Sequence, residues 1–158
     1  MLNIYIDTRE QKPLTFTSPY INEVFKTTLQ YGDYSCKVDG QRVPVVFERK
    51  SLSDLCGTLG KGHETFRREI DRAKEDKILL VIIVEVDLLK ILKGYKHSKM
   101  NGLGMVRTLF TLMTKHKVSF VTCRNRAEME LYISEFFYSY SKLMTESKCP
   151  TSKKRSKT

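Results

Sequence analysis

The chain has 158 residues, of which 41% are hydrophobic and 29% are charged, and its formal net charge at pH 7 is +10. These proportions are typical of a soluble globular domain, and the longest apolar run, Ile78–Val84, is too short to cross a bilayer, so no membrane span is expected. The positive charge favours a polyanionic partner, either a nucleic acid or an anionic membrane surface. The segment Lys148–Thr158 contributes five of these charges, so the rest of the chain, at +5, is basic in its own right.

The cysteines are scattered, without a C-x-x-C pair, and the three histidines are not spaced with them, so a zinc site is not expected. Free thiols in a reducing compartment fit this pattern better. The N-terminus begins directly with strand-like alternation, so we expect no signal peptide and an intracellular protein, in the cytoplasm or nucleus, or in the host cell if it is viral. The cysteines are Cys36, Cys56, Cys123 and Cys149.

The first predicted elements are a strand and a helix. Alternating apolar residues predict a strand over Leu2–Asp7, followed by a loop that contains Glu10 and ends at Pro13. Ser18-Pro19 combines a capping hydroxyl with a proline at the first helical position, which predicts a helix that ends near Gln30. The expected inner face of this helix consists of Ile21, Val24, Phe25 and Thr28.

A β-hairpin is predicted next. Tyr34–Val38 and Val43–Glu48 have strand character, and Asp39-Gly40 between them is a strong turn signal. Because a hairpin brings its two open ends together, Asp33 and Glu48 should meet in space.

Lys50 should lie on the same side as Glu48, because side chains alternate along a strand. Two acids are hard oxygen ligands that suit Mg²⁺ or Mn²⁺, and a lysine can hold a phosphate, orient a water or offset developing charge. This combination suits phosphodiester hydrolysis. The alternative is that Glu48 and Lys50 form only an exposed ion pair on a strand edge. Arg49 should point to the opposite side, from which it could still reach a carboxylate or a phosphate.

A helix start and a glycine-rich loop follow the hairpin. Ser51 to Asp54 form a capping-box pattern, so we interpret Asp54 as mainly structural. The loop with Gly57, Gly60 and Gly62 is either a mobile lid on the DNA backbone or a plain connection, and Glu64–Asp76 is a predicted helix. Candidate phosphate contacts in this region are Lys61, His63, Arg67 and Arg68.

The remaining elements alternate strand and helix. Ile78–Val86 is a near-continuous apolar run, typical of a central strand that is buried on both faces, and Glu85 near its end is expected to be peripheral. The basic segment Leu88–Lys99 is a short helix and loop that could face DNA. The other predictions are a helix over Asn101–His116 with Leu103, Val106, Leu109, Phe110 and Met113 inward, a strand over Val118–Thr122, and a helix over Ala127–Met144.

The last predicted helix has a wide aromatic stripe, which is most simply core, and the tail behind it is polar. The stripe comprises Met129, Ile133, Phe136, Phe137, Tyr140 and Leu143. We therefore predict a domain over residues 1–144 and a disordered basic tail over 145–158, which is a targeting signal or a non-specific grip on DNA.

The string from Gly32 to Asp54, together with Asp7–Glu10 and the strand Leu80–Glu85, resembles the signature of the XPF-type structure-specific endonucleases. These enzymes are a branch of the restriction-endonuclease-like superfamily, and the resemblance covers Leu2 to about Leu143. It implies an α/β fold with a central mixed β-sheet flanked by helices.

The resemblance implies a metal-dependent endonuclease that acts on branched or duplex DNA and leaves 3′-hydroxyl and 5′-phosphate ends. It adds Asp7, Glu10 and the Arg49 carbonyl to Asp33 and Glu48 as ligands of Mg²⁺ or Mn²⁺; the alternative for Asp7 is that it only anchors a turn. The sequence itself leaves two roles open for Arg9, a phosphate contact or the partner of an acid. It also implies a homodimer or heterodimer through Ala127–Met144, in which Tyr132, Tyr138 and Tyr140 could line the contact. Two alternatives are open: a DNA-binding pseudonuclease or partner-dependent subunit, and a Holliday-junction resolvase or restriction-like enzyme with the same metal ligands.

Overall fold

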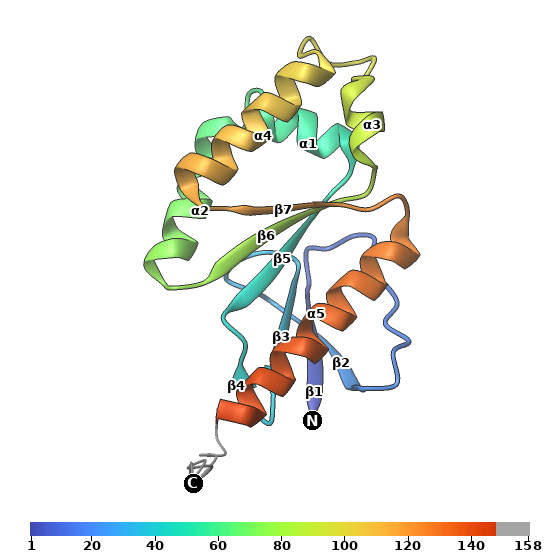
Figure 1. Ribbon diagram of the computed structural model, residues 1–158, viewed down its shortest axis with the longest axis vertical. Coiled ribbons are helices and arrows are strands. Elements are labelled where there is room, and N and C mark those ends of the chain that lie inside the picture. Colours follow the sequence, from blue (N-terminus) through green and yellow to red (C-terminus); the bar gives the residue numbers. More distant parts are fainter. Residues whose placement is uncertain (148–158) are drawn as a thin grey trace, which may run out of the picture.

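A computed structural model describes residues 1–147, which form one mixed sheet with helices on both faces (Figure 1). The tail from residue 148 onward, with Cys149 and the predicted targeting string, lies outside the described residues. The strands are β1 (Leu2–Asp7), β2 (Ile21–Thr27), β3 (Tyr34–Val38), β4 (Gln41–Arg42), β5 (Val45–Lys50), β6 (Leu79–Val84) and β7 (Ser119–Thr122). The helices are α1 (Leu52–Leu59), α2 (His63–Glu75), α3 (Leu88–Leu92), α4 (Gly102–His116) and α5 (Arg126–Ser147).

The sheet has the strand order β2-β1-β3-β5-β6-β7, and β4 pairs with β3 beside this path. β5, β6 and β7 are parallel, β3 is antiparallel to both β1 and β5, and β2 is parallel to β1 at the edge. β6 therefore lies between two parallel neighbours, as its continuous apolar run predicts. The predicted mixed sheet flanked by helices is confirmed.

The two faces of the sheet bury two separate cores, and the strand alternation decides which side chain enters which core. On β5, Val46 packs toward α1, α2 and α4, whereas Val45 and Phe47 pack toward α5. On β6, Ile82 and Ile83 divide in the same way. The same alternation continues to the end of β5, so neighbouring polar residues there point to opposite faces of the sheet.

The hairpin predicted from the Asp39-Gly40 turn is present, but the predicted second strand, Val43–Glu48, is replaced by two strands, β4 and β5, with Val43 and Pro44 between them. Asp39 and Gly40 both have positive φ, at 49° and 78°, as the tight turns of right-twisted hairpins require. At the open end, the Asp33 N–H donates to the Phe47 carbonyl at 2.8 Å. Gly32 precedes this contact with φ +65°, and a Cβ there would lie 2.8 Å from the Phe47 oxygen.

The helix predicted from Ser18-Pro19 is wrong, because the segment forms the edge strand β2. The Ser18 carbonyl accepts a hydrogen bond from the Ile21 N–H at 3.1 Å, so the proline occupies a tight turn rather than a first helical turn. Phe25 stacks on Tyr5 of the neighbouring strand, with ring centroids 5.2 Å apart. Apolar residues that fit one face of a helix here serve as cross-strand contacts on an exposed edge.

Two helices bury slightly different faces from those expected. In α4, Leu103 and Phe110 are about half exposed, and the buried positions are Met105, Val106, Leu109 and Leu112. In α5, Met129, Ile133 and Phe137 are buried, Leu143 is 59% exposed, and the helix continues to Ser147. Cys36, Cys56 and Cys123 are buried free thiols. Among the described helices, none has the length and apolarity needed to span a bilayer.

The positive φ of Gly32 and its close approach to Phe47 lead to the first prediction. Replacing Gly32 with Ala puts a side chain into a left-handed backbone against a carbonyl, so the free energy of unfolding should fall by at least about 1–2 kcal/mol. Urea denaturation of both proteins measures this difference.

Gly57→Ala is the matched control, because Gly57 lies inside α1 and a Cβ there meets nothing within 4 Å. This variant should be neutral or more stable by up to about 1 kcal/mol. A Gly32→Ala protein as stable as the parent would contradict the proposed conformation of the hairpin entrance.

Candidate active site

The last residues of β5 are polar, and their side chains lie outside the two hydrophobic cores. Glu48 and Lys50 lie on the face shared with α1 and α2, and the Lys50 Nζ donates to Glu48 Oε1 at 2.9 Å. Their side chains are 17% and 11% exposed, so the pair is largely but not fully withdrawn from solvent. The Lys50 ammonium also lies 5.1 Å from the centroid of the Phe66 ring on α2.

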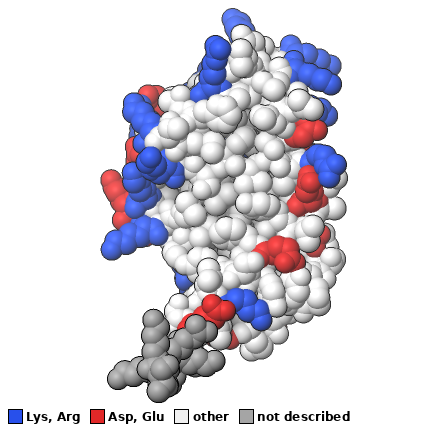
Figure 2. Space-filling model, in the orientation of Figure 1, with Lys and Arg blue, Asp and Glu red and all other residues white. Residues whose placement is uncertain are grey.

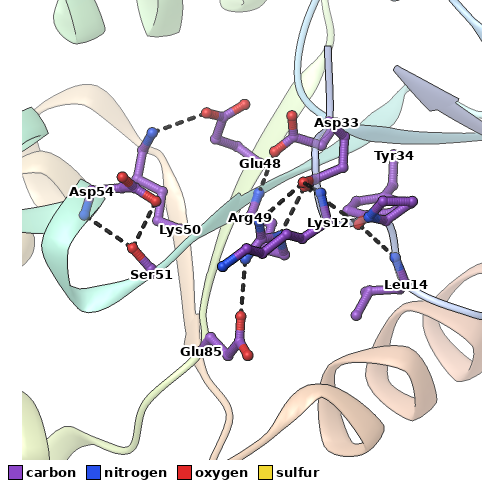
Figure 3. Close-up of polar contacts among 12 residues, drawn as sticks. Lys12, Leu14, Asp33, Tyr34, Glu48, Arg49, Lys50, Ser51, Asp54 and Glu85 are labelled. Carbon is purple, nitrogen blue, oxygen red and sulfur yellow. Dashed lines mark hydrogen bonds and ion pairs between the residues drawn. The ribbon is translucent and has the colours of Figure 1, made fainter. Parts of the chain in front are cut away.

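Asp33 lies beside Glu48, at the start of β3 (Figure 3). Its Oδ2 accepts a hydrogen bond from the Arg49 N–H at 2.8 Å, which fixes the carboxyl group against β5. Burial, followed by repulsion from the Glu48 carboxylate, raises the pKa of Asp33 to about 7. The hairpin therefore brings together the two acids that the sequence predicts, together with Lys50.

Two adjacent carboxylates suit a hard divalent cation such as Mg²⁺, which is often bound by one or two carboxylates and several waters. Repulsion between the two acids is also what a bound cation would relieve. Asp33 and Glu48 therefore fit the expected metal. Within residues 1–147, however, no three His, Cys, Asp or Glu side chains converge as a metal-binding group. The larger ligand set with Asp7 and Glu10 is not formed in this structure.

The carboxylate of Asp7, at the end of β1, is already hydrogen-bonded to other groups of the protein. It accepts hydrogen bonds from the Arg9 backbone at 2.7 Å, the Arg9 guanidinium at 2.7 and 3.0 Å, and the Leu29 N–H at 2.6 Å. The hydrogen bond from the Arg9 side chain, in particular, lowers the pKa of Asp7 to about 2. A role as metal ligand would require Arg9 to move, and it stays a prediction. Arg9 is paired with an acid here, although its exposed guanidinium still faces Asp33 closely enough to interact with it.

Glu10 is engaged in the same way, by Arg49 on the α5 side of the sheet. The Arg49 guanidinium donates to both Glu10 oxygens, at 2.8 and 3.0 Å, and to Glu85 at 2.9 Å. Burial opposes ionisation of Glu10, but hydrogen bonds from Arg49 and Lys12 outweigh it and hold its pKa below the ordinary value. Arg49 therefore points away from Glu48 and Lys50, as expected, and Glu85 is one of its partners. The ligand roles of Glu10 and the Arg49 carbonyl stay predictions.

The helix start after β5 has the predicted cap. Ser51 is the N-cap of α1, where its Oγ accepts from the Asp54 N–H at 3.1 Å and its hydroxyl donates to Asp54 Oδ2 at 2.7 Å. This cap fixes the chain direction directly after Lys50. Ser51 and Asp54, with Arg49, Glu85, Arg126 and others, line a hollow of about 810 Å³ beside the site.

The structure adds one acid that the sequence analysis missed, Glu69 on α2. Its pKa is raised by burial and then by the nearby Glu48 carboxylate, while Lys50 and a hydrogen bond from the Gly32 backbone act in the opposite direction. Glu69 lies three residues after Phe66 and directly before Ile70. Both Phe66 and Ile70 are buried. The place of Glu69 within the apolar arc of α2 was the available signal, because an acid there must face the sheet.

The other candidate DNA contacts surround the start of α2. Lys61 is exposed, and His63 is the partly buried first residue of the helix. Arg67 pairs with Glu64 at 3.1 Å, and the Arg68 Nε donates to the Glu64 carbonyl at 3.4 Å. Nothing in the geometry assigns these four residues to a nucleic acid, so their role stays a prediction.

Comparisons with known proteins agree with this architecture. Two solved structures of XPF from Aeropyrum pernix, one of them a complex with DNA, superpose with TM-scores of 0.65 and 0.61 at 17% and 18% sequence identity. The matches cover 92% and 93% of this chain but only 68% and 66% of the archaeal chains. At this identity they establish the fold alone. No curated protein matches the sequence closely enough to count as a relative.

A family model, the ERCC4 domain, matches residues 6–136. This range includes the hairpin with Asp33 and Glu48, the strand end with Lys50, and the first half of α5. The chain therefore belongs to the ERCC4 domain family.

Proposed function

We propose that this protein is a metal-dependent DNA endonuclease that hydrolyses phosphodiester bonds in branched DNA such as flaps, forks or four-way junctions. The observation that carries the proposal is the convergence of Asp33, Glu48 and Lys50 at the carboxyl end of β5, where open α/β sheets tend to place their sites. Membership of a family of DNA structure-specific nucleases supports the same activity.

Asp33 and Glu48 would hold the cation, Mg²⁺ or Mn²⁺. When bound, such an ion lowers the pKa of a coordinated water and offsets negative charge at phosphorus. The hydrogen bond from the Arg49 N–H holds Asp33 in place for this task, since it fixes Oδ2 against β5. Glu69, near both Glu48 and the Gly32 backbone, would be a third acid in the surroundings of the ion.

Lys50 is the residue of this chain that would supply positive charge at the active site. Its ammonium group is held between Glu48 and the face of the Phe66 ring, which restricts the positions that it can take. A phosphate that approached Glu48 would meet this ammonium group, which would offset the additional charge of the pentavalent transition state. In-line attack by water with the 3′-oxygen as the leaving group would then give 3′-hydroxyl and 5′-phosphate ends, the outcome that the family resemblance implies.

The preference for branched DNA rests on the family and on the archaeal XPF crystallised with DNA. This chain spans about two thirds of the length of those archaeal proteins. Contacts with junction arms that would depend on the remaining third are therefore not proposed for this chain.

We also propose that the protein acts as a dimer through α5. Leu131 is 60% exposed and Tyr132 is 38% exposed, and with Phe136 they line an open hollow of about 430 Å³ along the helix. Exposed apolar side chains grouped in this way favour contact with another protein surface, here a second copy of the chain or a related subunit.

The catalytic assignment predicts the behaviour of two isosteric variants. Glu48→Gln and Asp33→Asn should each lower the single-turnover rate on a labelled flap substrate by at least about a hundredfold, because each removes a charge that holds the cation. Binding of the same DNA, measured in chelator, should persist.

The matched control is Glu75→Gln, in the last turn of α2, which should cleave like the parent. Unchanged cleavage by both site variants would overturn the enzyme assignment. DNA binding by the parent without cleavage in Mg²⁺ or Mn²⁺ would instead favour a pseudonuclease.

The raised pKa of Asp33 predicts how stability depends on pH in chelator. The folded protein keeps a proton up to about pH 7 that the unfolded chain releases near pH 4, so the free energy of unfolding contains a component that falls as pH rises through this window. Asp33→Asn removes the component. Relative to the parent, this variant should therefore gain about 1–3 kcal/mol between pH 5 and pH 8.

Urea denaturation at both pH values measures this gain, and Mn²⁺ added at pH 8 should stabilise the parent but not the variant. An Asp33→Asn protein whose stability follows that of the parent at both pH values would refute the proposed crowding of the two acids.

The proposed dimer predicts that Leu131→Glu shifts the protein to a monomer in sedimentation velocity experiments, because a charge would be buried in an apolar contact. Lys142→Glu is a suitable control, since Lys142 is an exposed residue on the same helix. A parent protein that is monomeric at high concentration would exclude a homodimer.

A further inference from the structure

One long stretch of the chain is devoid of acidic residues. Between Asp87 and Glu128 there are nine lysines and arginines and not a single aspartate or glutamate. Three of the lysines, Lys93, Lys96 and Lys99, follow one another at every third position in the loop between α3 and α4. Such a run has no role in the proposed chemistry, which resides on β3, β5 and α2.

The loop borders an open hollow of about 590 Å³. No acidic side chain contributes to its lining, and the start of α4 opens into it, so the positive end of a 15-residue helix adds to the charge of the lysines. The polar lining consists of Lys93, Lys96, Ser98, Lys99 and Asn101, and Tyr95 is its aromatic member.

The three lysines are available for a ligand. All are exposed, and none forms a salt bridge within residues 1–147. The cations nearer the site differ in this respect, because Arg9, Arg49 and Lys50 are each paired with a carboxylate. Tyr95 packs partly against the core, so contact with a phosphate backbone suits the hollow better than base stacking on this ring.

The loop is also held in one shape. Gly94 turns the chain with φ +81°, the Ser98 N–H donates to the Tyr95 carbonyl at 2.8 Å, and the Met100 N–H donates to Ser98 Oγ at 3.1 Å. At its base, a Cβ on Gly102 would lie 2.1 Å from the Leu92 carbonyl oxygen, so α3 and α4 approach too closely for any side chain. The lysines therefore extend from a constrained backbone, which lowers the entropic cost of binding.

The position of the loop relates it to the site. α3 follows the carboxyl end of β6, and β6 is parallel to β5, so the loop lies on the same edge of the sheet as Glu48 and Lys50 (Figure 1). In Figure 2, basic side chains gather at the top right, over α3 and this loop.

A second lysine-lined hollow serves as a natural comparison. Lys74, Lys77 and Lys117 line it where α2 and α4 end, at the amino ends of β6 and β7 (the left side of Figures 1 and 2). These lysines are also exposed and, among the described residues, also without a carboxylate partner. They match the loop lysines in number and type but lie on the opposite edge of the sheet.

We propose that the loop between α3 and α4 binds the phosphate backbone of a DNA arm beyond the cleaved bond, through Lys93, Lys96 and Lys99. The inference rests on the proposed function, because it assigns a second contact surface to the same substrate. DNA that reaches Glu48 along the carboxyl edge of the sheet would meet this loop, whereas the opposite hollow would face away.

The test is the salt dependence of DNA binding by the full chain, measured in chelator with a labelled flap substrate. Replacing all three loop lysines with Gln should lower the slope of log K against log salt by about two to three, since each lost phosphate contact accounts for about 0.9. The same replacement at Lys74, Lys77 and Lys117 should leave the slope unchanged.

Equal losses of slope in the two triple variants, or no loss in either, would overturn the proposal, as would a parent protein that does not bind DNA. Because binding is measured without metal, an inactive parent whose salt slope still depends on the loop lysines would refute the nuclease assignment and leave the surface assignment intact.

Discussion

Two carboxylates that repel one another occupy the open end of a hairpin, and the surrounding structure holds them there. The hydrogen bond from the Asp33 N–H to Phe47 and the close approach of Gly32 to the same carbonyl fix the entrance of β3 against β5. Burial and the adjacent Glu48 then make ionisation of Asp33 unfavourable. In the absence of a cation this arrangement reduces stability, which is common where function requires charges that the fold alone would not favour.

Strand alternation divides the charged residues of this edge into two groups with different roles. On the α1 and α2 side, Glu48 and Lys50 lie close to Asp33 and are partly accessible. On the α5 side, Arg49 is buried between Glu10 and Glu85 and fastens the loop after β1 to the ends of β5 and β6. Consecutive residues of one strand thus have different surroundings. Glu48 and Lys50, the proposed catalytic pair, lie on one face of the sheet, and Arg49 between them holds the loop after β1 against the strand ends on the other.

Most of the fold and the centre of the site follow from local patterns in the sequence. The turn at Asp39-Gly40, the alternation along β5 and the apolar run of β6 depend on neighbouring residues, so they could be predicted. The segment from Ser18 to Gln30 could not, because a proline turn followed by apolar residues suits a helix or an edge strand equally, and pairing with β1 decides between them. The hydrogen-bonding partners of Asp7 and Glu10 depend on which arginines reach them in three dimensions. Glu69 was missed because only the packing of α2 against the sheet brings it near Glu48.

The central claim is that Asp33 and Glu48 together bind one divalent cation beside Lys50. Anomalous diffraction from crystals of the protein soaked in Mn²⁺ tests it most directly. The account predicts a peak between the two carboxylates, and its absence in crystals of the Asp33→Asn protein. A peak bound elsewhere, or a site that stays empty while the Lys50 ammonium remains the only cation beside Glu48, would contradict it.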